Sequence, residues 1–138
     1  WDSLGEFCAL GESLKFLADA RGNAKAQVLG DAVDVATQKV LENGNSPERK
    51  VGQPDNRTSH YWFARYWAEA LAAQDTDADL AAHFQPVAAA MVENEATILE
   101  ELMAGQGEAV DLGGYYHPDE PKTFAVMRPS ATLNGIID

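Results

Sequence analysis

Along most of the chain, apolar residues recur every three or four positions, which is the spacing of one face of an α-helix. The pattern predicts a first helix from Leu4 to about Ala20 and a second from Asn23 to Glu42, and these two should pack as a hairpin. The apolar face of the first helix contains Phe7, Cys8 and Gly11, so we expect Cys8 to be buried. A glycine within that face costs helix stability, and we expect Gly11 to let another backbone come close.

Residues that can cap a helix mark two helix starts. Ser3 and Glu6 form an S-x-x-E capping box at the first helix. Thr58 and Ser59 precede an aromatic-rich stretch, residues 60–74, whose apolar side chains cover a wide arc. We therefore expect this third helix to be buried on most of its circumference.

Proline and glycine punctuate the remainder. A short helix ends near Phe84, and Pro86 either kinks it or starts its successor, which runs to about Ala104. Residues 45–58 contain two prolines and a glycine, which predicts a shaped loop rather than a helix or strand. The tail, residues 111–138, is irregular in pattern, with room for a helical turn or two and a last short helix.

Alternating strand patterns and internal repeats are absent from the sequence. We therefore predict an all-α fold of about five helices, with a shaped loop and an irregular C-terminal tail. A chain of 138 residues fits one domain, so residues 1–138 should form a single helical region.

The charge is strongly negative, with a formal net charge of −12. The acidic residues concentrate between Ala68 and Pro121, where no Lys or Arg occurs, and such a field disfavours binding to nucleic acid or to anionic membrane lipid. No apolar run is long enough for a membrane helix. A single cysteine, Cys8, permits no internal disulfide, which favours a cytoplasmic location.

Against this acidity, the stretch from Ser46 to Trp67 is basic and aromatic. It holds Arg49, Lys50, Arg57 and Arg65, which are four of the ten Lys and Arg residues. A local excess of positive charge in so acidic a protein indicates an anion site.

Within this stretch, Arg49 is the better candidate for a ligand contact. It lies in the middle of the loop between Pro47 and Gly52, and the planar guanidinium fork suits phosphate oxygens. Arg57 lies directly before the predicted cap, so we expect it to form a structural bridge to Asp55 or to a backbone carbonyl. Glycine-rich phosphate-binding motifs are absent, so any phosphate contact must use side chains.

The other candidates for chemistry give weaker signals. His60, His83 and His117 are far apart and lack the spacing of zinc ligands, so no metal site is indicated. We expect His60 to be a hydrogen-bonded, partly buried ring. The GGYYHP run, residues 113–118, could close over a ligand, but a tight turn whose Tyr rings pack on the core is the preferred interpretation.

Specific motifs run through the chain from end to end, namely WDSLGEF at 1–7, GNAKAQVL at 22–29, SPERKVG at 46–52, DNRTSHY at 55–61, YWAEALAAQ at 66–74, GGYY at 113–116 and MRPSAT at 127–132. In this order they resemble the C-terminal part of the single-chain, NADP-dependent isocitrate dehydrogenases. The resemblance implies that the chain is roughly the last fifth of an enzyme that oxidatively decarboxylates isocitrate to 2-oxoglutarate, using NADP and Mg²⁺ or Mn²⁺.

The same resemblance implies roles for three residues. Trp1 and Asp2 would help to hold the adenosine end of NADP, and Arg49 would bind its 2′-phosphate. The residues that hold isocitrate and the metal lie outside this sequence, so no catalytic or metal-binding residue is expected here. The chain alone is therefore expected to be inactive, with NADP and the rest of the parent chain as its partners.

A second hypothesis remains open at this stage. The chain could be a free-standing, non-catalytic helical module, derived from that family, that binds a partner protein or an anionic ligand. The two hypotheses differ in the mass of the source protein, which is near 15 kDa for the module and several times larger for the enzyme.

Overall fold

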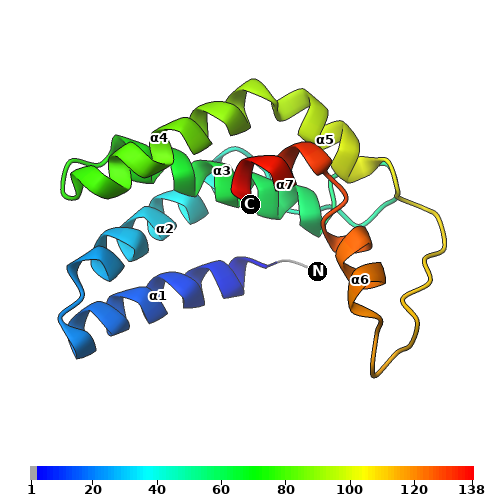
Figure 1. Cartoon of the computed structure of the whole chain (residues 1–138), viewed down its shortest axis with the longest axis horizontal. Coiled ribbons are helices and arrows are strands. Elements are labelled where there is room, and N and C mark those ends of the chain that lie inside the picture. The colour runs from blue at the N-terminus through cyan, green and yellow to red at the C-terminus, as the bar shows by residue number, and fades with distance from the viewer. Residues whose placement is uncertain (1–2) are drawn as a thin grey trace.

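The computed structural model describes residues 3–138, and within that range it contains seven α-helices and no strand (Figure 1). The helices are α1 Leu4–Arg21, α2 Ala24–Glu42, α3 Asn56–Ala73, α4 Ala78–Glu93, α5 Glu95–Met103, α6 Glu120–Met127 and α7 Ala131–Ile137. The predicted all-α class is confirmed. The expected number of about five helices is wrong, because the tail forms two helices, α6 and α7.

The first four helices pack in chain order, α1 on α2, α2 on α3 and α3 on α4 (Figure 1). The α1–α2 hairpin is close because both helices carry a glycine at the crossing. A Cβ added to Gly30 would lie 3.1 Å from the carbonyl oxygen of Gly11, and one added to Gly11 would lie 3.2 Å from Cγ1 of Val33. The predicted close approach at Gly11 is thus confirmed.

The aromatic helix α3 lies in the middle of the molecule. Its Phe63 stacks on Phe7 of α1, with ring centroids 4.0 Å apart, and its Leu71 is fully buried against α2. On another side, the hydroxyl of Tyr61 donates to the carbonyl oxygen of Met91 in α4 at 2.9 Å. This burial on several sides agrees with the wide apolar arc of the sequence.

The prediction that Cys8 is buried is wrong, because the thiol is exposed. Helix α1 packs mainly on α2, so its buried stripe is narrow and contains Phe7, Gly11 and Ala18. Cys8 lies about 100° around the helix from Phe7 and falls outside that stripe.

The helix starts also differ from the predictions. Helix α3 begins earlier than expected, because Asp55 caps it by accepting from the amides of Arg57 and Thr58, while Thr58 and Ser59 are buried within the helix. The expected capping box at Ser3 does not form. Its hydroxyl instead donates to Oδ1 of Asn56 at 3.1 Å, which joins the start of α1 to the first turn of α3.

The helix predicted to end near Phe84 does not end there, and Pro86 does not start its successor. Helix α4 continues through it to Glu93, and the break lies at Asn94, whose side-chain amide donates to the carbonyl oxygen of Ala90 at 2.9 Å. This local hydrogen bond competes with continuation of the helix. Helix α5 then leaves in a new direction (Figure 1).

The last helix, α7, returns to pack against α4 and α5. Glu101 of α5 holds its N-terminus by accepting from the hydroxyl of Ser130 at 2.6 Å and from the amide and hydroxyl of Thr132. These hydrogen bonds hold the pKa of the Glu101 carboxyl below its ordinary value. Part of the tail that the sequence leaves irregular is therefore fixed to the core.

Candidate functional site

The loop between α2 and α3 is fixed by its own backbone. The amide of Glu48 donates to the carbonyl oxygen of Pro54 at 2.7 Å, which closes the loop on itself, and Gly52 adopts a positive φ of 85°. At the start of the loop, Oδ1 of Asn45 accepts from the hydroxyl of Tyr66 at 2.8 Å. The shaped loop predicted from the prolines and glycines is thus present, although α3 begins at Asn56 and shortens it.

A single glutamine ties this loop to the end of α5. Oε1 of Gln106 accepts from the amide of Gly52 at 2.8 Å, and its Nε2 donates to the carbonyl oxygen of Gln53 at 2.9 Å and to Oδ2 of Asp55 at 3.1 Å. Gln106 could not be identified from the sequence, because a pairing across more than fifty residues leaves no local signal. Gly107 beside it also lies close to the loop, since an added Cβ would meet Cγ1 of Val51 at 3.0 Å.

Arg57 forms both of the bridges considered from the sequence. Its guanidinium donates to Oδ2 of Asp55 through Nε at 3.0 Å and to the carbonyl oxygen of Val126 at 2.9 Å. Burial raises the pKa of the Asp55 carboxyl, but the hydrogen bonds from Arg57 and Gln106 outweigh it, so the pKa is lowered. Arg57 is thus committed to structure, as predicted.

Arg49, by contrast, is exposed and free. Among residues 3–138, its side chain has no hydrogen-bond or ion-pair partner. It lies on a groove of about 450 Å³ between the loop, the segment that follows α5 and the C-terminal end of α6, lined by Glu48, Arg49, Lys50, Val51, Asp55, Asn56, Arg57, Gly105, Gln106, Gly107, Glu108, Val110, Val126 and Met127. A free guanidinium on a groove can receive an anion bidentately.

Other members of the basic stretch are differently placed. Arg65 pairs with Glu69 at 3.0 Å and with Glu95, and its guanidinium lies over the ring of Trp62, so it joins α3 to α5. Lys50 is exposed on the same groove as Arg49. Within residues 3–138, the basic stretch thus has two committed cations in α3, Arg57 and Arg65, and two loop cations, Arg49 and Lys50, whose side chains have no ion-pair partner.

Two of the three predicted site residues, Trp1 and Asp2, lie outside the described residues. Ser3, which follows them, is buried and joined to Asn56 at the first turn of α3. His60, one turn further along α3, is exposed rather than half-buried, and its Nδ1 lies 2.7 Å from the carbonyl oxygen of Asn56. Its predicted hydrogen bond is present, but the predicted partial burial is wrong.

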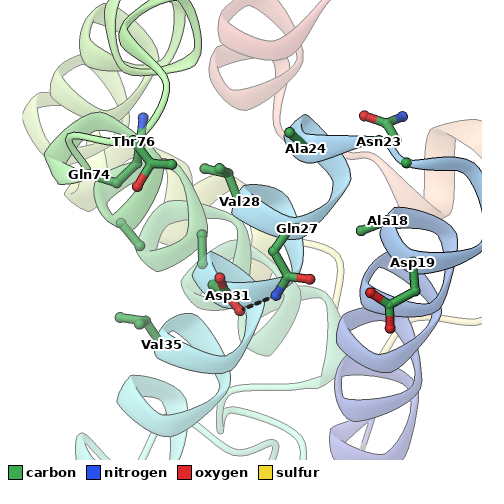
Figure 2. Close-up of a pocket in the computed structure, with 13 residues that line it drawn as sticks. Ala18, Asp19, Asn23, Ala24, Gln27, Val28, Asp31, Val35, Gln74 and Thr76 are labelled. Carbon is green, nitrogen blue, oxygen red and sulfur yellow. Dashed lines mark hydrogen bonds between the residues drawn. The ribbon is translucent and has the colours of Figure 1, made fainter.

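A larger hollow, of about 540 Å³, lies between α1, α2 and the α3–α4 connection (Figure 2). Among the described residues that line it are Asp19 and Asp31 but no Lys or Arg. Asp31 already accepts from Gln27 at 2.9 Å, as the dashed line in Figure 2 shows. Its negative charge makes this hollow unsuitable for a phosphate, in contrast to the groove beside Arg49.

The predicted packing of the GGYYHP rings on the core is wrong. Tyr115 and Tyr116 are both exposed and contact each other edge to face, with ring centroids 5.0 Å apart.

Residues 3–138 contain no group of three or more His, Cys, Asp or Glu side chains placed to hold a metal ion. Over the same residues, no helix combines the length and apolar character needed to cross a membrane.

A known protein family matches the whole chain, as the sequence motifs predict. The profile of the family described as monomeric isocitrate dehydrogenase matches residues 1–138. The chain belongs to this family. The resemblance expected from the motifs is confirmed.

The chain is similar to three bacterial enzymes, each named as an NADP isocitrate dehydrogenase. It is 55% identical over 138 residues to that of Corynebacterium glutamicum, with 100% of this chain and 19% of the relative covered. It is 53% identical to that of Azotobacter vinelandii, over 99% of this chain and 18% of the relative. It is 49% identical to isocitrate dehydrogenase (NADP) 2 of Mycobacterium tuberculosis, over 100% of this chain and 18% of the relative. The chain thus spans about a fifth of the length of these relatives.

Proposed function

We propose that the chain is the C-terminal segment of an NADP-dependent isocitrate dehydrogenase and supplies one wall of its cofactor site. In this proposal, Arg49 pairs with the 2′-phosphate of NADP. The observation that carries the proposal is the free guanidinium of Arg49 on a groove whose neighbouring cation, Arg57, is already committed. The family membership and the names of the relatives support the choice of cofactor.

The geometry fits a phosphate group. The loop that carries Arg49 is held at both sides of the residue by the Glu48–Pro54 and Gly52–Gln106 hydrogen bonds, so the guanidinium is presented from a fixed backbone. A planar fork can donate two parallel hydrogen bonds to phosphate oxygens. Because the rest of the chain is strongly acidic, a dianionic phosphate is favoured at this basic loop over other surfaces.

Trp1 and Asp2 complete the proposal at the adenosine end of the cofactor. They precede Ser3, which is fixed beside the first turn of α3, and α3 follows directly on the Arg49 loop. In this proposal Trp1 contacts the adenosine end, and Asp2 accepts from a cofactor hydroxyl or orients an arginine.

These roles are roles in binding and orientation. When bound, NADP accepts a hydride from the substrate at its nicotinamide. The segment described here would fix the opposite end of the cofactor and select for its 2′-phosphate. The residues that hold isocitrate and the Mg²⁺ or Mn²⁺ ion would be supplied by the remainder of a cytoplasmic enzyme, so the chain alone would be inactive.

The test is the cofactor preference of the enzyme that contains this chain. Charge-assisted hydrogen bonds contribute about 1.5–3 kcal/mol, so Arg49→Ala should lower kcat/KM for NADP about 10- to 100-fold and leave kcat/KM for NAD unchanged. Arg49→Lys should recover only part of the loss, because it keeps the charge without the fork. Arg21→Ala, which removes an exposed arginine of α1, is the control. An unchanged preference for NADP over NAD in Arg49→Ala would remove Arg49 from the cofactor site.

A further inference from the structure

The loop and helix that precede Met127 differ from the rest of the molecule, and we call residues 108–127 the arm. Helix α6, which ends the arm, has no buried residue. The arm nevertheless carries several large apolar side chains, and all of the following are exposed: Val110, Tyr115, Tyr116, Phe124 and Met127. In Figure 1 the arm extends away from the packed helices.

The tip of the arm is a closed turn with a defined backbone. The amide of Asp119 donates to the carbonyl oxygen of Leu112 at 2.7 Å, and the amide of Gly113 donates to Oδ1 of Asp111 at 2.8 Å. Gly113 has a φ of 79°, and a Cβ there would lie 2.8 Å from Cβ of Asp119, so only glycine fits. The turn is thus shaped by specific contacts across its base.

This turn presents the two tyrosines outward. Tyr115 is 91% exposed and Tyr116 is 86% exposed, and their rings are held edge to face. Tyrosine is enriched where proteins meet, because it brings a large rigid surface at low cost in conformational entropy. A defined turn with two adjacent exposed tyrosines at its tip has the chemistry of a docking element.

Helix α6 supports the same conclusion independently. An isolated helix of eight residues is not stable in water, so most of its stability must come from packing. Near its start, Lys122 pairs with Asp111 of the arm, and at its C-terminal end Arg57 donates to the carbonyl oxygen of Val126 and Arg128 lies over the ring of Phe124. Val126 is half-buried, but Phe124 and Met127 remain 47% and 58% exposed, so much of the apolar surface of α6 is left uncovered by residues 3–138.

We propose that the arm docks, through Tyr115 and Tyr116 and the apolar side of α6, into an apolar surface on the remainder of the same enzyme chain. This inference rests on the proposed function. The remainder of the enzyme chain is the expected docking partner because of the length of the relatives. They match this chain with only 18–19% of their own sequence, so about four-fifths of each relative is left for the arm to pack against.

The docking has a consequence for the cofactor groove. Val110 near the start of the arm and Val126 and Met127 at its end line the groove that carries Arg49. Docking of the arm would therefore fix the wall of the groove that faces the basic loop. Loss of the docking contact should weaken NADP binding without any change in Arg49 itself.

The experiment is hydroxyl-radical footprinting of the intact native enzyme, with the urea-denatured enzyme as reference and mass spectrometry as readout. Tyr115 and Tyr116 should be oxidised at least about tenfold more slowly in the native enzyme, as should the buried reference residue Met91. Oxidation of both tyrosines at the denatured rate, with Met91 still protected, would overturn the proposal. Protection that vanishes on dilution, or that needs added NADP, would also overturn it, because the occupant would then be a second copy or the cofactor.

A pair of variants gives a second readout. The double variant Tyr115→Ser with Tyr116→Ser should raise KM for NADP several-fold and increase oxidation of Phe124 and Met127, whereas Tyr115→Phe with Tyr116→Phe should behave as the wild type. Docking would be contradicted if the serine double variant and the wild type had the same KM for NADP and the same oxidation of Phe124 and Met127. The intact mass separates the two levels of the argument: a source protein near 15 kDa refutes the proposed function, while a several-fold larger enzyme with exposed tyrosines refutes only the docking of the arm.

Discussion

Two regions of the molecule are held together in different ways. In the helical body, formed by α1 to α5 and α7, buried apolar side chains from successive helices interlock around α3. The edge is formed by the Arg49 loop and the arm. There, hydrogen bonds from individual polar side chains such as Gln106 and Arg57 hold the segments together, and apolar side chains are exposed to solvent.

The difference explains where the proposed function lies. Polar contacts of defined direction fix a loop without covering it, so a side chain such as Arg49 remains free for a ligand. Burial in the body stabilises the fold, and the side chains that it covers cannot contact a ligand. In the proposal, the body provides stability, and the edge provides the surfaces that would meet a cofactor and the rest of an enzyme.

The largest effect should follow from a cavity in the body. Ile98 of α5 is fully buried, so Ile98→Ala should lower the free energy of unfolding by about 2–5 kcal/mol. Leu41→Ala, at a side chain that is 51% exposed, should lower it by less than about 1 kcal/mol. Urea denaturation of the protein, followed by circular dichroism, gives both values. If both variants lost the same free energy of unfolding, the distinction between the buried body and the exposed surface would be wrong.

A smaller effect should distinguish the edge by its dependence on pH. The pKa of Asp55 is lowered in the folded state, so its contribution to stability is present above its unfolded pKa, near pH 4, and is lost as the pH falls through the lower folded value. Asp55→Asn keeps the shape but cannot ionise, so its unfolding midpoint should fall less steeply between pH 5 and about pH 2 than that of the wild type.

The control for this experiment is Asp31→Asn, which changes an exposed carboxylate of α2 that, among residues 3–138, accepts only from a neutral glutamine. It should follow the wild-type profile. Identical profiles for all three proteins would mean that the Asp55 contacts with Arg57 and Gln106 add nothing to the stability of the edge.

Much of the helical body could be predicted from the sequence, because helical periodicity is a pattern of neighbouring residues. Periodicity placed α1, α2 and α3 and the close approach at Gly11, since a helical face repeats within a few residues. Errors occurred where tertiary packing decides the outcome. Cys8 shares the apolar pattern of α1 but falls outside the narrow buried stripe of that helix, which packs mainly on α2.

The edge could be predicted only in part. Loop position and side-chain chemistry predicted a structural bridge from Arg57, which forms to both Asp55 and a carbonyl, and a ligand contact for Arg49, which stays a prediction. Gln106 was missed because its partners are distant in sequence, and the outward rings of Tyr115 and Tyr116 were missed because an apolar residue indicates burial without saying where the covering surface comes from. If the arm docks on the rest of an enzyme, that surface is encoded outside these residues.

The most direct test of the central proposal compares two probes that differ by a single 2′-phosphate. Calorimetry of the intact enzyme should show that Arg49→Ala weakens binding of adenosine 2′,5′-bisphosphate by about 10- to 100-fold and changes binding of 5′-AMP by less than about twofold. Equal weakening of both probes would mean that Arg49 acts on the adenosine or on the fold, and unchanged binding of both would contradict its role at the 2′-phosphate.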